Sequence, residues 1–210
     1  TLDEYTADEL KDISSMLGRF SQISVRENSG INLCHKLGVK ATHVLDPTML
    51  LNRTDYLQLI DNATGPVTRN KGLMTYILDP SEQSARAIET LSLKLDKEPF
   101  STIAPAGTPA NTVEQWLAGF RDADFIVTDS FHACVFSIIF GKPFIVISNV
   151  NRGTARIDSL LEMLGLMHHK ISVSDLHAIS PADYTFDQRN LNTTIQKLRE
   201  KSFDILKNIN

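Results

Sequence analysis

The segment from residue 125 to residue 147 constrains the fold of this chain more than any other. It reads FIVTDSFHACVFSIIFGKPFIVI, with two short apolar runs, 125–127 and 143–147, on either side of a helix-like stretch, 130–140. Apolar runs of this length are typical of strands that are buried on both faces. Because a connection that holds a helix is too long for a hairpin, the segment predicts a right-handed crossover between two parallel strands.

The same alternation continues along the chain. Strand patterns occur at 20–25, 41–45, 72–78, 100–103, 125–127, 143–147 and 170–173. Helix patterns occur at 7–17, 27–37, 54–60, 81–93, 112–120, 130–140, 156–164 and 191–209. This order predicts an α/β fold, a doubly wound, mostly parallel, Rossmann-like sheet with helices on both faces.

We expect residues 1–180 to form this domain and residues 181–210 to form a C-terminal helical tail that packs on it. The chain opens TLDEYTADEL, without a methionine or a signal-peptide pattern. This start predicts a processed protein or a piece of a longer one, with a partner domain missing before Thr1.

Composition narrows the possible partners to small molecules. The formal net charge is -4 and no basic cluster occurs, so we expect no nucleic-acid partner. The apolar runs fall far short of the ~20 residues of a transmembrane helix. The two cysteines do not form a disulfide framework or a zinc motif, which predicts a reducing, cytoplasmic location and no metal. The glycines match neither the dinucleotide-binding nor the P-loop spacing.

Polar residues after the strands are the candidates for chemistry, because ligands of parallel sheets bind beyond the carboxyl ends of the strands. After the strand at 125, we expect Thr128 or Asp129 to cap the next helix. The hydroxyl of Ser130 and the amides of 130–132 could then hold an anion, and His132 could act as a general acid or base. The alternative is a capped core helix in which His132 packs with a satisfied hydrogen bond.

Arginines that follow two of the predicted strands are further candidates for binding an anion. Arg26 directly follows a predicted strand and could bind phosphate or carboxylate oxygens, although a surface salt bridge would also explain it. The segment NVNRGTARID supplies Asn149, Arg152 and Arg156 at the start of a helix, where a solvated helix end is the alternative. Asp46, in Asp-Pro-Thr, could orient Arg26, but the motif is also an ordinary turn signal, and we favour the structural role.

Four of these segments, in this order, resemble the polysaccharide pyruvyl transferase family. They are ISVRE at 23–27, LDPTMLL at 45–51, ADFIVTDSFHACVFSIIFGK at 123–142 and NRGTARIDSLL at 151–161. The resemblance covers about residues 15 to 165. It implies the second, donor-binding domain of a protein with two Rossmann-like domains of the GT-B kind.

The resemblance also implies an activity, the transfer of a pyruvyl group from phosphoenolpyruvate to a sugar of a surface polysaccharide or its lipid-linked precursor, forming a ketal. His132 would be the general acid and Arg26 would bind donor oxygens. The other implied donor-binding residues are Ser24, Ser130, Phe131, Asn149, Arg152 and Arg156. Phosphoenolpyruvate is a substrate here, so no cofactor is expected, and a lipid-linked acceptor would bring the protein to a membrane surface.

The chain departs from the family pattern at two positions. Ser130 stands two residues before the histidine, where ketal-forming members tend to carry a basic residue. Ala133 stands directly after it, where many relatives have glycine. Two other functions are therefore open, a sugar-nucleotide-dependent glycosyltransferase domain and a non-catalytic module that binds a phosphorylated ligand.

Overall fold

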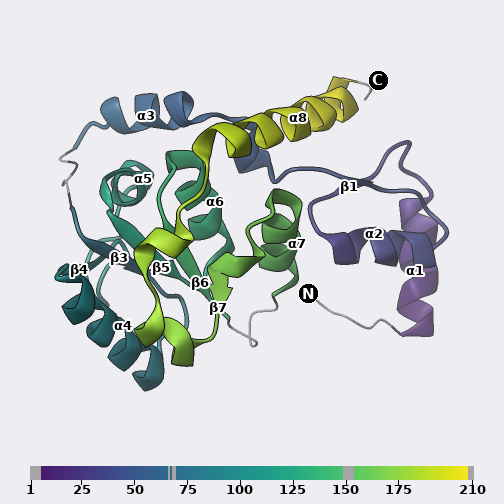
Figure 1. Ribbon diagram of the computed structural model, residues 1–210. Coiled ribbons are helices and arrows are strands. Elements are labelled where there is room, and N and C mark those ends of the chain that lie inside the picture. Colours follow the sequence, from purple (N-terminus) through teal and green to yellow (C-terminus); the bar gives the residue numbers. More distant parts are fainter. Residues whose placement is uncertain (1–5, 66, 68–69, 149–153, 208–210) are drawn as a thin grey trace.

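The protein is described by a computed structural model that covers residues 6–65, 67, 70–148 and 154–207. Its largest sheet has five parallel strands in the order β4-β3-β5-β6-β7 (Figure 1). The strands are β3 (Leu73–Tyr76), β4 (Pro99–Ser101), β5 (Phe125–Thr128), β6 (Phe144–Ile147) and β7 (Lys170–Ile171). The predicted parallel α/β fold is confirmed.

Helices cover both faces of this sheet. The helices are α3 (Arg53–Asp61), α4 (Glu82–Leu95), α5 (Val113–Asp122), α6 (Phe131–Phe140), α7 (Ala155–Leu164) and α8 (Gln188–Lys207). Alternate residues of β5 explain the two layers: Ile126 packs into the core formed with α5, α6 and α7, whereas Phe125 and Val127 pack into the core on the α4 side.

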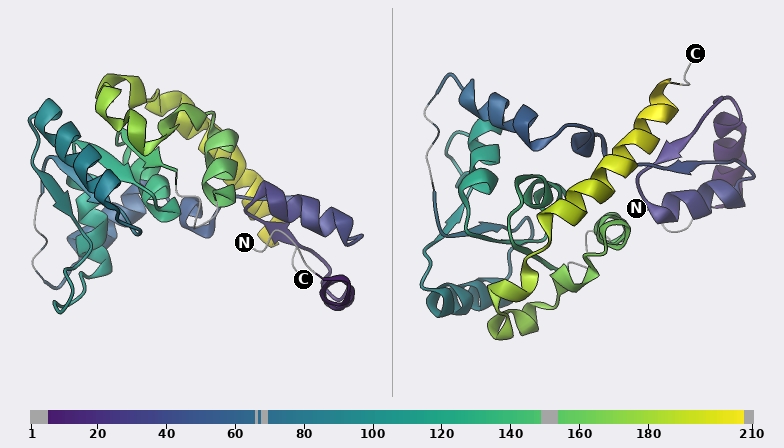
Figure 2. Two further views of the ribbon diagram at one scale, coloured as in Figure 1. Left: turned by 90° about the horizontal axis from the view of Figure 1, so that it is seen from below. Right: turned by 45° about the horizontal axis from the view of Figure 1, so that its top comes forward.

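The N-terminal strands do not join this sheet. β1 (Ser24–Val25) and β2 (Thr42–His43) pair only with each other, in parallel, and they lie beside α1 (Ala7–Leu17) and α2 (Asn28–Lys36), away from the five strands (Figures 1 and 2). We had expected one sheet for all the strands, and that expectation is wrong. Periodicity identifies a strand but does not identify its neighbour in the sheet.

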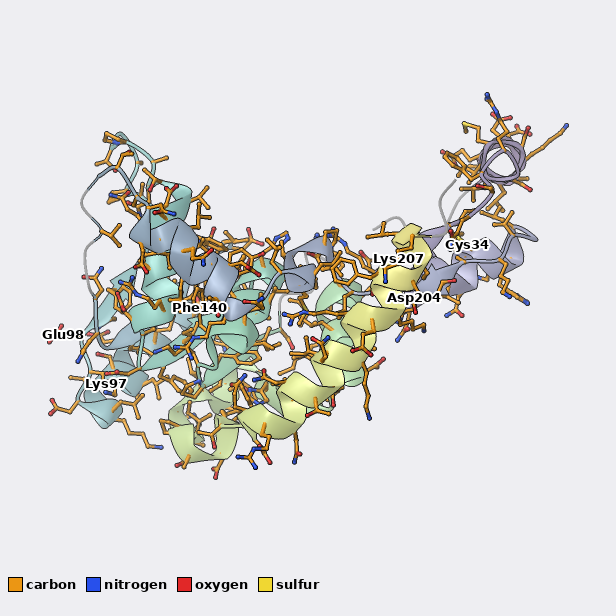
Figure 3. All side chains as sticks on the ribbon, turned by 90° about the horizontal axis from the view of Figure 1, so that it is seen from above. Cys34, Lys97, Glu98, Phe140, Asp204 and Lys207 are labelled. Carbon is orange, nitrogen blue, oxygen red and sulfur yellow. The ribbon has the colours of Figure 1, made fainter. Side chains whose placement is uncertain are left out.

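The long helix α8 connects the two parts of the chain. Figure 3 follows it from the side of the five-stranded sheet toward the side where Cys34 of α2 lies, with Asp204 and Lys207 labelled near its end. Arg199 of α8 donates to the carbonyls of Met49 and Leu51, both at 2.6 Å, and the hydroxyl of Ser202 accepts from the amide of Leu45 at 3.2 Å. These bonds fix the segment that follows β2.

A fully buried histidine lies next to β6. His169, in the short helix η3 (Met167–His169), stacks on Phe144 with ring centroids 4.5 Å apart. Its Nδ1 lies 2.8 Å from the carbonyl oxygen of Phe144, and its Nε2 has no hydrogen-bond partner among the described residues. Burial lowers the pKa of His169 to about 4, so the ring is neutral in the folded protein at pH 7.

This histidine predicts a loss of stability in acid. The unfolded chain takes up a proton near pH 6.5 that the folded chain resists until about pH 4, so the free energy of unfolding falls as the pH falls through this window. The full effect is about 3 kcal/mol. Urea unfolding at pH 7 and pH 4.5 should show it, and His169→Phe should flatten this dependence. The matched change at an exposed histidine, His177→Phe, should not.

Candidate functional site

The strand order places a topological switch point between β3 and β5. From β3 the chain crosses to β4 on one side, and β5 and the strands after it lie on the other side. In sheets of this kind the ligand crevice lies beyond the carboxyl ends of the two strands at the switch point. Here those ends are Tyr76 of β3 and Thr128 of β5, which are paired in register.

Side chains from the exit of β5 bridge the switch point. The hydroxyl of Thr128 donates to the carbonyl of Tyr76 at 2.6 Å and accepts from the amide of Ser130 at 3.0 Å. The carboxylate of Asp129 accepts from the amides of Leu78 and Asp79, at 2.7 and 3.0 Å. These bonds connect the loop after β3 to the start of α6.

The predicted cap of α6 is therefore wrong. The N-cap residue is Ser130, not Thr128 or Asp129, and the side chain of Ser130 makes no capping hydrogen bond. The physical reason is long-range, because the carboxylate of Asp129 is bonded to amides of the neighbouring strand exit. The first-turn amides of α6 thus keep the positive helix end that the predicted anion site requires.

Three helices begin near this point without a side-chain cap. Besides α6, these are α2, with Glu27 at the N-cap, and α7, with Thr154 at the N-cap. By contrast, α1, α3, α4 and α5 each begin with a complete capping box. Two contacts join α2 to α7, because the amide of Asn28 donates to the hydroxyl of Ser159 at 2.9 Å and Nε of Arg156 lies 3.8 Å from the Glu27 carboxylate. α7 reaches α6 through Arg156, whose guanidinium lies 5.9 Å from the centroid of the Phe131 ring.

Phe131 brings the two predicted arginines together. The guanidinium carbon of Arg26 lies 5.5 Å from the centroid of the Phe131 ring, and that of Arg156 lies 5.9 Å from it. Phe131 itself is buried, so it forms a fixed platform at the first position of α6. Arg26 also forms an ion pair with Asp46. Two guanidiniums from different elements thus face one helix N-terminus.

His132 is half-buried beside this pair. It lines a cavity of about 210 Å³ together with Leu78, Asp129, Ser130, Phe131, Arg156 and Ile157. Burial lowers its pKa below the ordinary value, the charge of Asp46 opposes this, and Arg26 and Arg156 lower the pKa further. An anion bound among these groups would raise this pKa, because it would favour the imidazolium form. A bound anion would therefore help to load the proton that an acid catalyst needs.

Of the remaining predicted residues, Ser24 is the one that lies in the described part of the chain, and it is not brought into this cluster. Ser24 is exposed in β1 and does not line the cavity, so a donor contact for it has no support. Asn149 and Arg152 lie outside the described residues. Within the described part of the chain, no group of three or more His, Cys, Asp or Glu could hold a metal ion, and no helix is long and apolar enough to cross a membrane.

Asp46 pairs with Arg26, although its sequence motif favours a structural role. A signal for it existed, because Asp46 follows β2 as Arg26 follows β1, and these two strands are parallel neighbours. The turn-like motif Asp-Pro-Thr is also real: Asp46 accepts from the amide of Thr48 and precedes the short helix η1 (Pro47–Leu50). One carboxylate performs both roles.

The fold and the cluster define an α/β protein with a polar cavity beside its switch point. The family model for polysaccharide pyruvyl transferase matches residues 4–151, which is more than half of the chain, so the protein belongs to this family. The predicted resemblance is confirmed. The family is named for a transferase activity.

The solved structures that match include a crystal structure described as the glycotransferase of kitacinnamycin. It shares 13% sequence identity, with a TM-score of 0.41, and the match covers 69% of this chain and 42% of that chain. No individually curated protein matched the sequence.

The bridge made by Asp129 predicts a stability effect. Asp129→Ala should lower the free energy of unfolding by roughly 2 kcal/mol or more, because two amides at the switch point lose their acceptor. Asp129→Asn, which keeps one acceptor oxygen, should cost less. Urea unfolding measures both changes. Asp124→Ala, which removes an exposed ion pair with Lys97, is the control and should cost under about 1 kcal/mol. Equal losses in the three variants would contradict the bridge.

Proposed function

We propose that the protein transfers a pyruvyl group from phosphoenolpyruvate to two hydroxyls of a glycan, forming a ketal and releasing inorganic phosphate. The observation that carries this proposal is that Arg156 and the uncapped start of α6 line one cavity with His132, and that Arg26 lies over the ring of Phe131, which lines the same cavity. Phosphoenolpyruvate carries a phosphate and a carboxylate, which these cations and amides suit.

The reaction assigns one task to each group. His132, as imidazolium, gives its proton to the methylene carbon of the donor, and positive charge develops on the carbon that bears the phosphate oxygen. One sugar hydroxyl adds to this carbon, the carbon–oxygen bond to phosphate breaks, and the second hydroxyl adds. Of the two hydroxyl protons, one restores His132 and the other leaves with phosphate. Arg26, Arg156 and the amides of α6 stabilise the departing phosphate.

Arg156 supplies a cation where the family pattern differs in this chain. Ser130 has no charge, but the guanidinium of Arg156 reaches the same helix start from α7, across the ring of Phe131. The departure at Ser130 thus leaves the crevice with two arginines among its described residues. The hydroxyl of Ser130, which lines the cavity, adds a further donor.

The size of the cavity supports a compact donor. At about 210 Å³ it lies below the range of about 300–1,000 Å³ that holds drug-sized ligands, and a sugar nucleotide is larger still. The nearby acidic groups are also occupied, because Asp46 pairs with Arg26 and Asp129 accepts from two amides. Neither is placed to hold the hydroxyls of a ribose.

Ligand binding tests the donor without knowledge of the acceptor. Phosphoenolpyruvate should raise the melting temperature and bind in calorimetry, and Arg26→Ala should weaken this binding about tenfold or more, through the loss of a charge-assisted contact. Stabilisation by a sugar nucleotide but not by phosphoenolpyruvate would instead favour a glycosyltransferase.

Turnover tests the role of His132. With phosphoenolpyruvate and an acceptor glycan, His132→Gln should abolish phosphate release and ketal formation while the melting temperature stays near that of the parent, because the ring has no hydrogen bond to a described residue. His177→Gln, at an exposed position, is the control. Donor binding without phosphate release from any acceptor would favour a non-catalytic binding module.

A further inference from the structure

The carboxylate of Asp46 is almost completely buried, with 4% of the residue exposed. Its Oδ1 accepts from the amide of Thr48 at 3.0 Å and from the hydroxyl of Thr48 at 2.6 Å, and its Oδ2 faces Arg26. Burial alone would raise the pKa of Asp46, but the bonds from Thr48 and Arg26 offset this and lower it. Asp46 is therefore a fixed negative charge at neutral pH.

The segment around Asp46 is held from several sides. Arg199 of α8 donates to the carbonyl of Met49, and the hydroxyl of Tyr56 donates to the carbonyl of Thr48 at 2.7 Å. The amide of Leu45 donates to Ser202. The carboxylate thus has little freedom, whereas its partner Arg26 has a side chain that is 36% exposed. In this pair the buried aspartate orients the arginine.

The orientation of Arg26 matters because its guanidinium lies close to the first turn of α6. Its guanidinium lies over Phe131, the first residue of α6, and His132 follows directly. The charged groups that act on His132 are Asp46, Arg26 and Arg156, while Asp129 lines the same cavity and Glu27 faces Arg156. The charge of Asp46 raises the pKa of His132, whereas the charges of the two arginines lower it.

We propose that Asp46 is a positioning residue of the donor site: through its ion pair it holds Arg26 over the ring of Phe131, the residue next to His132. This inference rests on the proposed function for the identity of the donor, but the positioning itself does not require that donor. It assigns to Arg26 and Asp46, which follow β1 and β2, a direct part in a site whose proposed acid catalyst stands in the first turn of α6.

The proposal makes an unusual prediction about binding. Asp46→Asn removes a negative charge next to an anion site, and simple electrostatics would then make phosphoenolpyruvate bind more tightly. If Asp46 positions Arg26, the same change releases the guanidinium and binding weakens instead. The asparagine oxygen still accepts from Thr48, so the start of η1 is kept. The sign of the change in affinity therefore separates the two mechanisms.

Two measurements test the proposal. An NMR titration of the His132 ring, assigned with His132→Gln, should show a higher pKa in Arg26→Met than in the parent, and Asp46→Asn should lower the pKa less in the parent than in the Arg26→Met background, because in the parent it also releases Arg26. Calorimetry should show phosphoenolpyruvate binding to Asp46→Asn about tenfold more weakly than to the parent. The double variant Arg26→Met with Asp46→Asn leaves no unpaired buried charge, and it should bind no more weakly than Arg26→Met alone.

Tyr56→Phe is the matched control, because it loosens the same segment and changes no charge. It should leave the His132 titration in place and change affinity less than threefold. An effect of Asp46→Asn on the His132 pKa that is equal with and without Arg26, tighter donor binding in Asp46→Asn, or equal effects of Tyr56→Phe would each overturn the proposal. Failure of the parent to bind phosphoenolpyruvate would count against the proposed function, and the titration alone would then decide the role of Asp46.

Discussion

The parallel pairing of β3 with β5 determines where functional groups of this protein can lie. Parallel strands send all their exits to one edge of the sheet, and the two strands at the switch point continue in opposite directions from there. The space between them is closed by the Asp129 carboxylate, which accepts from the amides of Leu78 and Asp79. Because Asp129 is engaged in this way, it does not cap α6, and the first-turn amides of that helix remain without a side-chain cap.

Charge in the crevice is balanced by few groups. Three uncapped helix starts and two arginines converge near Phe131, and the described carboxylates that face the arginines are Asp46 and Glu27. Each arginine thus faces one carboxylate, and the first-turn amides of the helices add a positive end that would favour a phosphate-bearing donor of the kind proposed above. His132 responds to the same potential, which makes its proton affinity depend on whether the anion is present.

The class of fold could be predicted from sequence because it depends on local patterns. The apolar run at 144–147 and the helix at 131–140 carry their own periodicity, and the structure places them as expected. The partners of the strands could not be predicted in the same way, as Ser24–Val25 shows by pairing only with Thr42–His43. The prediction of the N-cap of α6 was wrong for a related reason. A bond from Asp129 to residues some 50 positions earlier has no signature in the neighbouring sequence.

The site joins two parts of the chain that form separate sheets. Arg26 and Asp46 follow β1 and β2, whereas His132 and Arg156 follow β5 and β6. The parts meet where Asn28 donates to Ser159 of α7, and where α8 holds the segment after β2. A ligand that contacts both Arg26 and the start of α6 would stabilise the packing of these two parts against each other. The gain in stability equals the difference between its binding free energies for the packed and the separated forms. Donor binding and the packing of the N-terminal strands against the larger sheet are therefore linked quantities, and a change to either one alters the other.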